Sequence, residues 1–140
     1  MLRDSLYSRL SDDAGVSAIV SNRIYPVVIP QQSYDEATKQ PCLVYSIDTD
    51  ARGITFEGTD SLVRCRLTID CYATNPDTPH TLAEAVRDCL VDFEGTVAAS
   101  TSPISSVRIK RIFMDGEVEQ HDEEPGLYHV MQRYLVWYVE

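Results

Sequence analysis

Residues that could perform catalysis are present in this chain, but they do not form a known catalytic pattern. His80 precedes an expected helix, His121 lies in an acidic segment and His129 lies in an expected strand. None of them is spaced to pair with a nucleophile. The sequence also contains no glycine-rich phosphate loop, GxSxG, HExxH or EF-hand pattern. We therefore expect no catalytic residue and no cofactor, and we do not expect the chain to be an enzyme.

The cysteines do not have the spacing of a metal site or of a redox pair. No CxxC pair occurs, and no histidine lies at zinc-ligand spacing. We predict that the thiols are buried, reduced and packed as small apolar groups, because a disulfide framework belongs to secreted proteins. The four residues are Cys42, Cys65, Cys71 and Cys89.

An acidic run covers residues 115–126, with no basic residue between Arg111 and Arg133. It lacks the alternating ligands and turn glycine of a calcium loop, so no metal site is expected. Two interpretations stay open. The run is either a solvated acidic loop or a charged rim that faces a partner or a pore. The candidate partner-facing residues are Glu117, Glu119, Asp122, Glu123 and Glu124.

Basic residues gather on the expected strands. One interpretation is cross-strand pairing with Asp48 or Asp70 on the solvent face, where each pair contributes little. The other is a set of salt bridges to the acidic segment of a neighbouring subunit. Both interpretations stay open for Arg64, Arg66, Arg108, Lys110 and Arg111.

Bulk composition restricts the class of protein. With 140 residues the chain is expected to be a single domain over residues 1–140. No apolar run is long enough to cross a membrane, and the charged first ten residues do not resemble a signal peptide. The net charge of −10 disfavours a module that reads DNA, because such a surface repels phosphates. It is compatible with a channel through which DNA passes without being held.

The segment 62–73, LVRCRLTIDCYA, is the clearest strand in the sequence. Apolar residues occupy every second position from Val63 to Ala73, and polar residues occupy the positions between them. This period of two is typical of an antiparallel strand that is half buried. At roughly 3.3 Å per residue the segment spans about 40 Å, which is long for a strand in a small domain.

The remaining patterns predict an α+β fold. Leucines at 2, 6 and 10 indicate a first helix, residues 16–20 a short turn of helix, and the stripe from Leu82 to Phe93 the clearest helix. Thr78 or the Thr81–Glu84 pair would cap that helix. Segments 43–48, 107–114 and 127–139 are further expected strands, and segment 98–106 is an expected loop. The result is an antiparallel-rich β-sheet with a long hairpin and two to three helices packed on one face.

Residues 49–61 connect strand 43–48 to strand 62–73. Gly53 and Gly58 flank a short apolar group, so we expect a mobile tip on a long hairpin. The strand 127–139 is aromatic on both faces, which indicates a second covering surface such as a neighbouring subunit. The candidate residues at the tip are Asp48, Asp50, Arg52, Glu57 and Asp60.

The order of these patterns resembles the tail-completion, or tail-terminator, family of long non-contractile-tailed phages (siphophages) and prophages. The resemblance runs from Met1 to Tyr138 through LRDSLYSRLSDDAGVSAIVSNRIYPVVIPQ, PCLVYSID, CRLTIDCYA, LAEAVRDCL and YHVMQRYLVWY. It implies a structural virion protein, assembled in the host cytoplasm, that forms a homohexameric ring. The ring would end polymerisation of the tail tube and offer a docking surface to the head–tail connector. DNA would pass through its lumen, and no membrane would be involved.

Two other functions remain open from the sequence. One is a different neck or tail-tube subunit of related fold, which would polymerise by itself where a terminator stops at one ring. The other is a small monomeric binding or enzymatic domain.

We place the residue 49–61 tip and its acidic residues at the lumen or the adjacent ring as a hypothesis.

Overall fold

The computed structural model describes residues 2–21, 23–26, 41–55, 58–91, 93–99, 102–122 and 127–139. Within these ranges, only the backbone is described for residues 2–4, 49–55, 58–62, 96–99, 102–107, 121–122 and 127.

The described helices are α1 (Leu2–Asp12), α2 (Ala14–Val20) and α4 (Asp77–Leu90). The described strands are β1 (Ile24–Pro26), β2 (Cys42–Thr55), β3 (Gly58–Ala73), β4 (Gly95–Ala99), β5 (Ser102–Asp122) and β6 (Leu127–Val139). They form one sheet in the order β1-β2-β3-β6-β5-β4, in which only the β1–β2 pair is parallel. The predicted α+β class with an antiparallel-rich sheet is confirmed.

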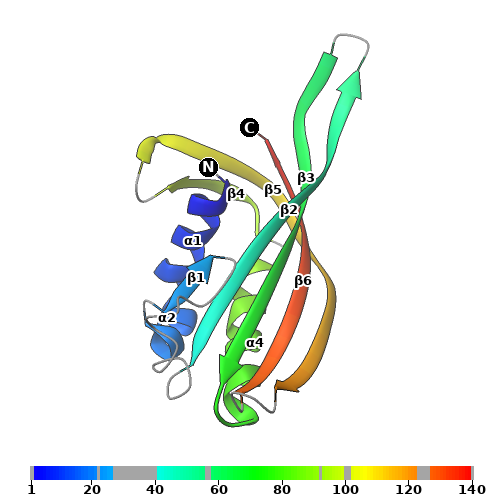
Figure 1. Cartoon of the computed structure of the whole chain (residues 1–140). Coiled ribbons are helices and arrows are strands. Elements are labelled where there is room, and N and C mark those ends of the chain that lie inside the picture. Colours follow the sequence, from blue (N-terminus) through cyan, green and yellow to red (C-terminus); the bar gives the residue numbers. More distant parts are fainter. Residues whose placement is uncertain are drawn as a thin grey trace.

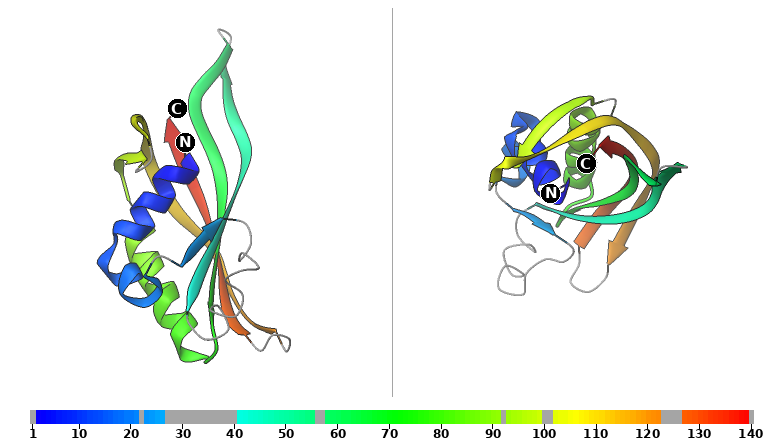
Figure 2. Two further views of the ribbon diagram at one scale, coloured as in Figure 1. Left: turned by 60° about the vertical axis from the view of Figure 1, so that its left-hand side comes forward. Right: turned by 90° about the horizontal axis from the view of Figure 1, so that it is seen from above.

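The helices lie on one face of a strongly curved sheet (Figures 1 and 2). Seen from above, the sheet bends around α1 and α4 (Figure 2, right). Sheets twist because each strand has a right-handed twist, so a long sheet curls around whatever packs on its concave side. Among the described residues, no helix is both long and apolar enough to cross a membrane.

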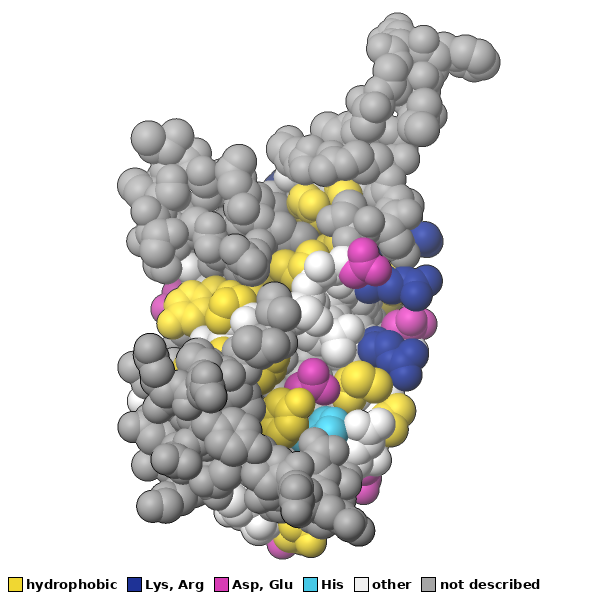
Figure 3. Space-filling view, in the orientation of Figure 1, with side chains coloured by type: hydrophobic (Ala, Val, Ile, Leu, Met, Phe, Trp, Pro, Cys, Tyr) yellow, Lys and Arg dark blue, Asp and Glu magenta, His cyan; other side chains and the backbone are white. Residues whose placement is uncertain are grey.

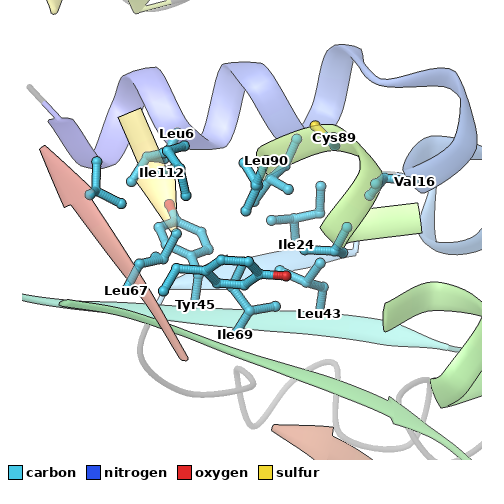
Figure 4. Close-up of a cluster of buried hydrophobic side chains, with 14 of the residues drawn as sticks. Leu6, Val16, Ile24, Leu43, Tyr45, Leu67, Ile69, Cys89, Leu90 and Ile112 are labelled. Atoms are coloured by element: carbon cyan, nitrogen blue, oxygen red, sulfur yellow. The ribbon is translucent and has the colours of Figure 1, made fainter. Parts of the chain in front are cut away.

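The alternation predicted for residues 62–73 is confirmed. The six residues at odd positions from Val63 to Ala73 are buried, whereas Arg64 to Tyr72 at even positions are exposed or half-buried. The buried side chains of β3 meet Leu6 of α1, Leu90 of α4 and Ile112 of β5 (Figure 4). Each such large apolar side chain contributes about 1.5–3 kcal/mol by leaving water, so this face of β3 organises the core.

Helix α4 buries the predicted apolar stripe, but its predicted caps are wrong. Leu82, Val86, Cys89 and Leu90 are buried against the sheet. The first turn is capped by Asn75, whose Oδ1 accepts hydrogen bonds from the backbone N–H of Asp77 at 3.2 Å and of Thr78 at 2.8 Å. An Asn upstream of the helix satisfies the orphan N–H groups, so neither expected threonine caps the helix.

Two segments predicted as loops contain strand. Residues 98–106 include the end of β4 and the start of β5, which pair with each other. The acidic segment 115–126 is not a loop up to Asp122, because β5 continues to that residue beside β6. Gly116 has a φ of 156° and lies at the register shift between Met114 and Gly116, which is a β-bulge. Glycine has no Cβ, so it adopts this φ without a steric clash. Residues 123–126 lie outside the described part of the chain.

The long β2–β3 hairpin extends past the rest of the sheet (Figure 1). Strand β6 pairs with β3 only as far as Leu62, opposite Val139, whereas β2 and β3 stay paired to Thr55 and Gly58. The two strands therefore include most of the segment 49–61 that the sequence indicated as a tip. Register shifts after Thr49 and Arg52 bend this part of the hairpin.

Candidate interaction surface

The sheet face turned away from the helices carries charged and apolar side chains side by side. We call it the outer sheet face. The register aligns its rows: Arg66 lies opposite Asp48 of β2 and Leu135 of β6, and Leu135 lies opposite Phe113 of β5. Its other members alternate with the buried residues of the same strands. The outer sheet face comprises Asp48, Arg64, Arg66, Asp70, Arg108, Arg111, Phe113, Val118, Met131, Arg133, Leu135 and Trp137.

Apolar side chains on this face remain accessible. Phe113 is 48% exposed and Val118 is 38% exposed. Trp137 is half-buried, with the guanidinium carbon of Arg64 5.6 Å from its ring centroid. A cation over an indole ring is attracted by its π electrons, so Arg64 and Trp137 hold each other in place. Aromatic residues and arginine are enriched in protein–protein interfaces, so this composition is typical of an interaction surface.

The outer sheet face is basic, although the chain as a whole is acidic. Six of the twelve Lys and Arg residues lie on β3, β5 and β6. The acidic members of the outer sheet face are Asp48 of β2 and Asp70 of β3, against five arginines. In Figure 3, basic side chains gather at the right-hand side of the molecule, with acidic and hydrophobic groups between them. All five basic residues that the sequence singled out lie on these strands, and Arg108 is 3.6 Å from Glu94.

For most of the predicted tip residues the side chain lies outside the described part of the structure. Asp48 is exposed and lies opposite Arg66 in the register of β2 and β3. Asp50 and Arg52 lie on β2 and Asp60 on β3, where only the backbone is described. Glu57 lies outside the described residues.

The acidic end of β5 makes contacts within the chain. Gln132 donates a hydrogen bond to Glu117 Oε1 at 3.0 Å, and His80 Nε2 lies 3.0 Å from Glu119 Oε1. Both glutamates lie on the helix side of the sheet, away from the arginines of the outer sheet face. Asp122 ends β5 without a described side chain, and Glu123 and Glu124 lie outside the described residues.

A shallow hollow of about 320 Å³ lies where the start of α4 meets β5 and β6. His129 lies in it with its ring centroid 4.8 Å from that of Tyr72. The hollow has no serine, threonine or cysteine in its lining that could act as a nucleophile. No group of three or more His, Cys, Asp and Glu among the described residues could hold a metal ion. The lining residues are Pro76, Pro79, His80, Glu119, Gln120, Tyr128, His129 and Val130.

The cysteines are buried and form no disulfide, as predicted. Burial raises the pKa of Cys42 and of Cys89 from 9.0 to about 11, since a thiolate loses its hydration in the core. It also raises the pKa of Cys71. A thiol with a raised pKa stays protonated at neutral pH and is a poor nucleophile.

The sequence did not single out the apolar members of the outer sheet face. Phe113, Leu135 and Trp137 lie in segments 107–114 and 127–139, which the sequence predicts only as strands. Their signal is the same alternation that revealed β3, because Trp137, Leu135 and Arg133 occupy every second position of β6. The register across β5 and β6 then joins them into one surface, and register is not visible in a single sequence.

A family model described as "Tail completion protein gp17" matches residues 4–139. The chain belongs to this family. A search of curated protein sequences gave no match. Among solved structures, a chain of "Virion of native gene transfer agent (GTA) particle" is 18% identical, with a TM-score of 0.72 over 99% of this chain and 95% of that one. At this identity the likeness shows a shared fold. Family membership makes the chain a structural protein of a phage tail.

Proposed function

We propose that this tail completion protein is a tail terminator. Copies of the chain form a ring, hexameric by the family resemblance, that caps the tail tube and ends its growth. The opposite side of the ring receives the head–tail connector, and DNA passes through the lumen. No catalytic step is part of this function.

The observation that carries the proposal is the family match along nearly the whole chain, joined to the reach of the β2–β3 hairpin. The paired strands continue beyond the last residue that β6 contacts, so in this part of the hairpin β2 and β3 pair only with each other. An arm that a core does not need is available for a neighbouring ring or subunit. Strand edges of this kind are also common sites of association between chains.

Shortening the hairpin tests the proposal. Residues 53–62 are replaced by Asn-Gly, a two-residue type I′ turn that joins Arg52 to its existing partner Val63. No described core residue is removed, and the shared sheet loses only the final Leu62–Val139 pair. We therefore expect the variant to fold, with a circular dichroism spectrum that retains the helix and sheet signals. In a phage carrying the variant, we expect heads and tails that do not join, counted by electron microscopy. Joined particles at the wild-type level would show that the hairpin has no role in joining.

A matched variant separates the length of the hairpin from its charge. Asp50→Asn, Glu57→Gln and Asp60→Asn keep every backbone atom and remove three negative charges. If the acidic tip keeps DNA unbound in the lumen, these particles should join normally but release DNA slowly in an ejection assay. Ejection at the wild-type rate would place the tip away from the DNA.

A further inference from the structure

The outward side of α4 is an acidic stripe. Asp77, Glu84 and Asp88 are exposed and spaced by seven and four residues, so they lie on one side of the helix. Thr81 completes the row. At 1.5 Å per residue, Glu84 and Asp88 are about 6 Å apart along the helix axis. The basic residue of the last turn, Arg87, is half-buried beside this stripe.

The outer sheet face offers cations at a similar spacing. Arg64 and Arg66 point the same way on β3, about 7 Å apart. Arg133 of β6 lies diagonally beside Arg66, because the partner of Arg133 is Thr68 and that of Arg66 is Leu135. Arg66 and Arg133 are exposed. The apolar side chains of Phe113 and Leu135 lie next to these arginines.

We propose that the outer sheet face of one copy docks on the acidic stripe of α4 in a second copy. The inference rests on the proposed function, in which copies form a ring, and names the two surfaces that meet. Arg66 and Arg133 would face Glu84 and Asp88, and the exposed Phe113 would lose water in the contact. The partner is thus a second copy of this chain.

The placement of the two surfaces favours a head-to-tail contact. The helices cover the concave face of the sheet, so the outward side of α4 and the outer sheet face lie on opposite sides of the molecule (Figure 2). A contact between two different surfaces of identical chains repeats from copy to copy, and it closes into a ring when the rotation allows. A symmetric dimer would bring two basic faces together, which like charges disfavour.

Charge reversal on each surface tests the pairing. Arg66→Glu with Arg133→Glu makes the sheet acidic, and Glu84→Lys with Asp88→Lys makes the helix basic. Each double variant then presents like charges to its own copies, so we expect its association to weaken by roughly tenfold or more in sedimentation velocity. Mixing the two variants, or joining all four changes in one chain, restores opposite charges at every contact and should restore association.

The matched control is Asp12→Lys, the same kind of charge reversal on an exposed residue of α1 that lies off both surfaces. It should associate as the wild type does. Association of the wild type should also fall between about 0.05 M and 0.5 M salt, because ions screen exposed charges. Three results would overturn the proposal: a wild-type chain that stays monomeric, reversals without effect, or mixtures that fail to restore association.

One alternative partner is DNA, and the same variants report on it. If the sheet reversal lowers binding to a short DNA duplex and leaves self-association intact, the outer sheet face is a nucleic-acid surface and the proposal is wrong. Variants that associate normally but fail to cap tails would instead contradict the terminator function and leave this interface in place. The two proposals therefore fail in different ways.

Discussion

At the scale of single residues, Gln132 shows how one buried polar side chain joins three elements. Its Nε2 donates to the backbone carbonyl of Ala83 in α4 at 2.9 Å and to Glu117 of β5 at 3.0 Å. Its Oε1 accepts from the hydroxyl of Tyr134 at 2.9 Å. Gln132 and Tyr134 are fully buried, and burial raises the pKa of the tyrosine well above its ordinary value. A glutamine in the middle of an aromatic strand gives no sequence signal for this network.

We predict that Gln132→Leu lowers the free energy of unfolding by about 1–3 kcal/mol, because it leaves the Tyr134 hydroxyl buried without its acceptor. The Gln132→Leu, Tyr134→Phe double variant is the matched control, since it removes the stranded hydroxyl as well. It should recover part of the loss, as a double-mutant cycle in urea would measure. A single variant as stable as the wild type would show that the network contributes nothing.

The buried thiols predict a loss of stability in alkaline solution. The folded-state pKa of Cys42 and Cys89 is about 11, above the ordinary 9.0, so folding favours the protonated form. This contribution is complete below pH 9 and is lost as pH rises towards 11. Each thiol should remove about 1.4 kcal/mol from the free energy of unfolding by pH 10. Urea unfolding of wild type and Cys89→Ala, compared at pH 8 and pH 10, should show a smaller decrease in the variant. Equal decreases would contradict the assignment.

At the scale of elements, prediction from sequence succeeded where one face of a segment is buried and failed where neither is. Strand β3 and helix α4 each have one buried face, so apolar residues recur along them at the spacing of a strand and of a helix. The end of β5 differs, because Asp115, Glu117, Glu119 and Gln120 are all exposed. Its strand conformation comes from backbone pairing with β6, which leaves no trace in side-chain polarity.

The cap of α4 gives an element-scale prediction. Asn75→Ala removes the acceptor for two backbone N–H groups, so it should lower the free energy of unfolding by about 1 kcal/mol. Asn75→Asp keeps a side-chain oxygen in place and adds a favourable charge at the helix N-terminus, so it should retain the wild-type stability. Thermal unfolding of both variants measures the difference. The competing assignment, a cap at Thr81, predicts that Thr81→Ala is the damaging change and Asn75→Ala is neutral.

At the scale of the whole molecule, charge is unevenly distributed. The chain carries a net charge of −10, yet half of its basic residues lie on three strands of one sheet, and an acidic stripe lies on the helix behind it. The sequence showed the totals and the strand positions of the arginines. It could not show that Arg66 and Arg133 are neighbours, since that depends on the pairing of β3 with β6. The proposed interface therefore depends on neighbours that only the folded sheet brings together.

The last prediction concerns the limit of assembly. A terminator must bind one end of the tail tube and expose a different surface on the other side, so adding more protein cannot lengthen the structure. We expect purified protein mixed with headless tails to add a single layer of density at one end, unchanged as its concentration rises, in negative-stain images. Protein alone should reach one discrete size in light scattering, because a head-to-tail interface that closes has no free end. Tubes that lengthen with concentration would identify a tube subunit instead. A monomer that never binds tails would identify a small binding domain, whose outer sheet face then meets some other protein.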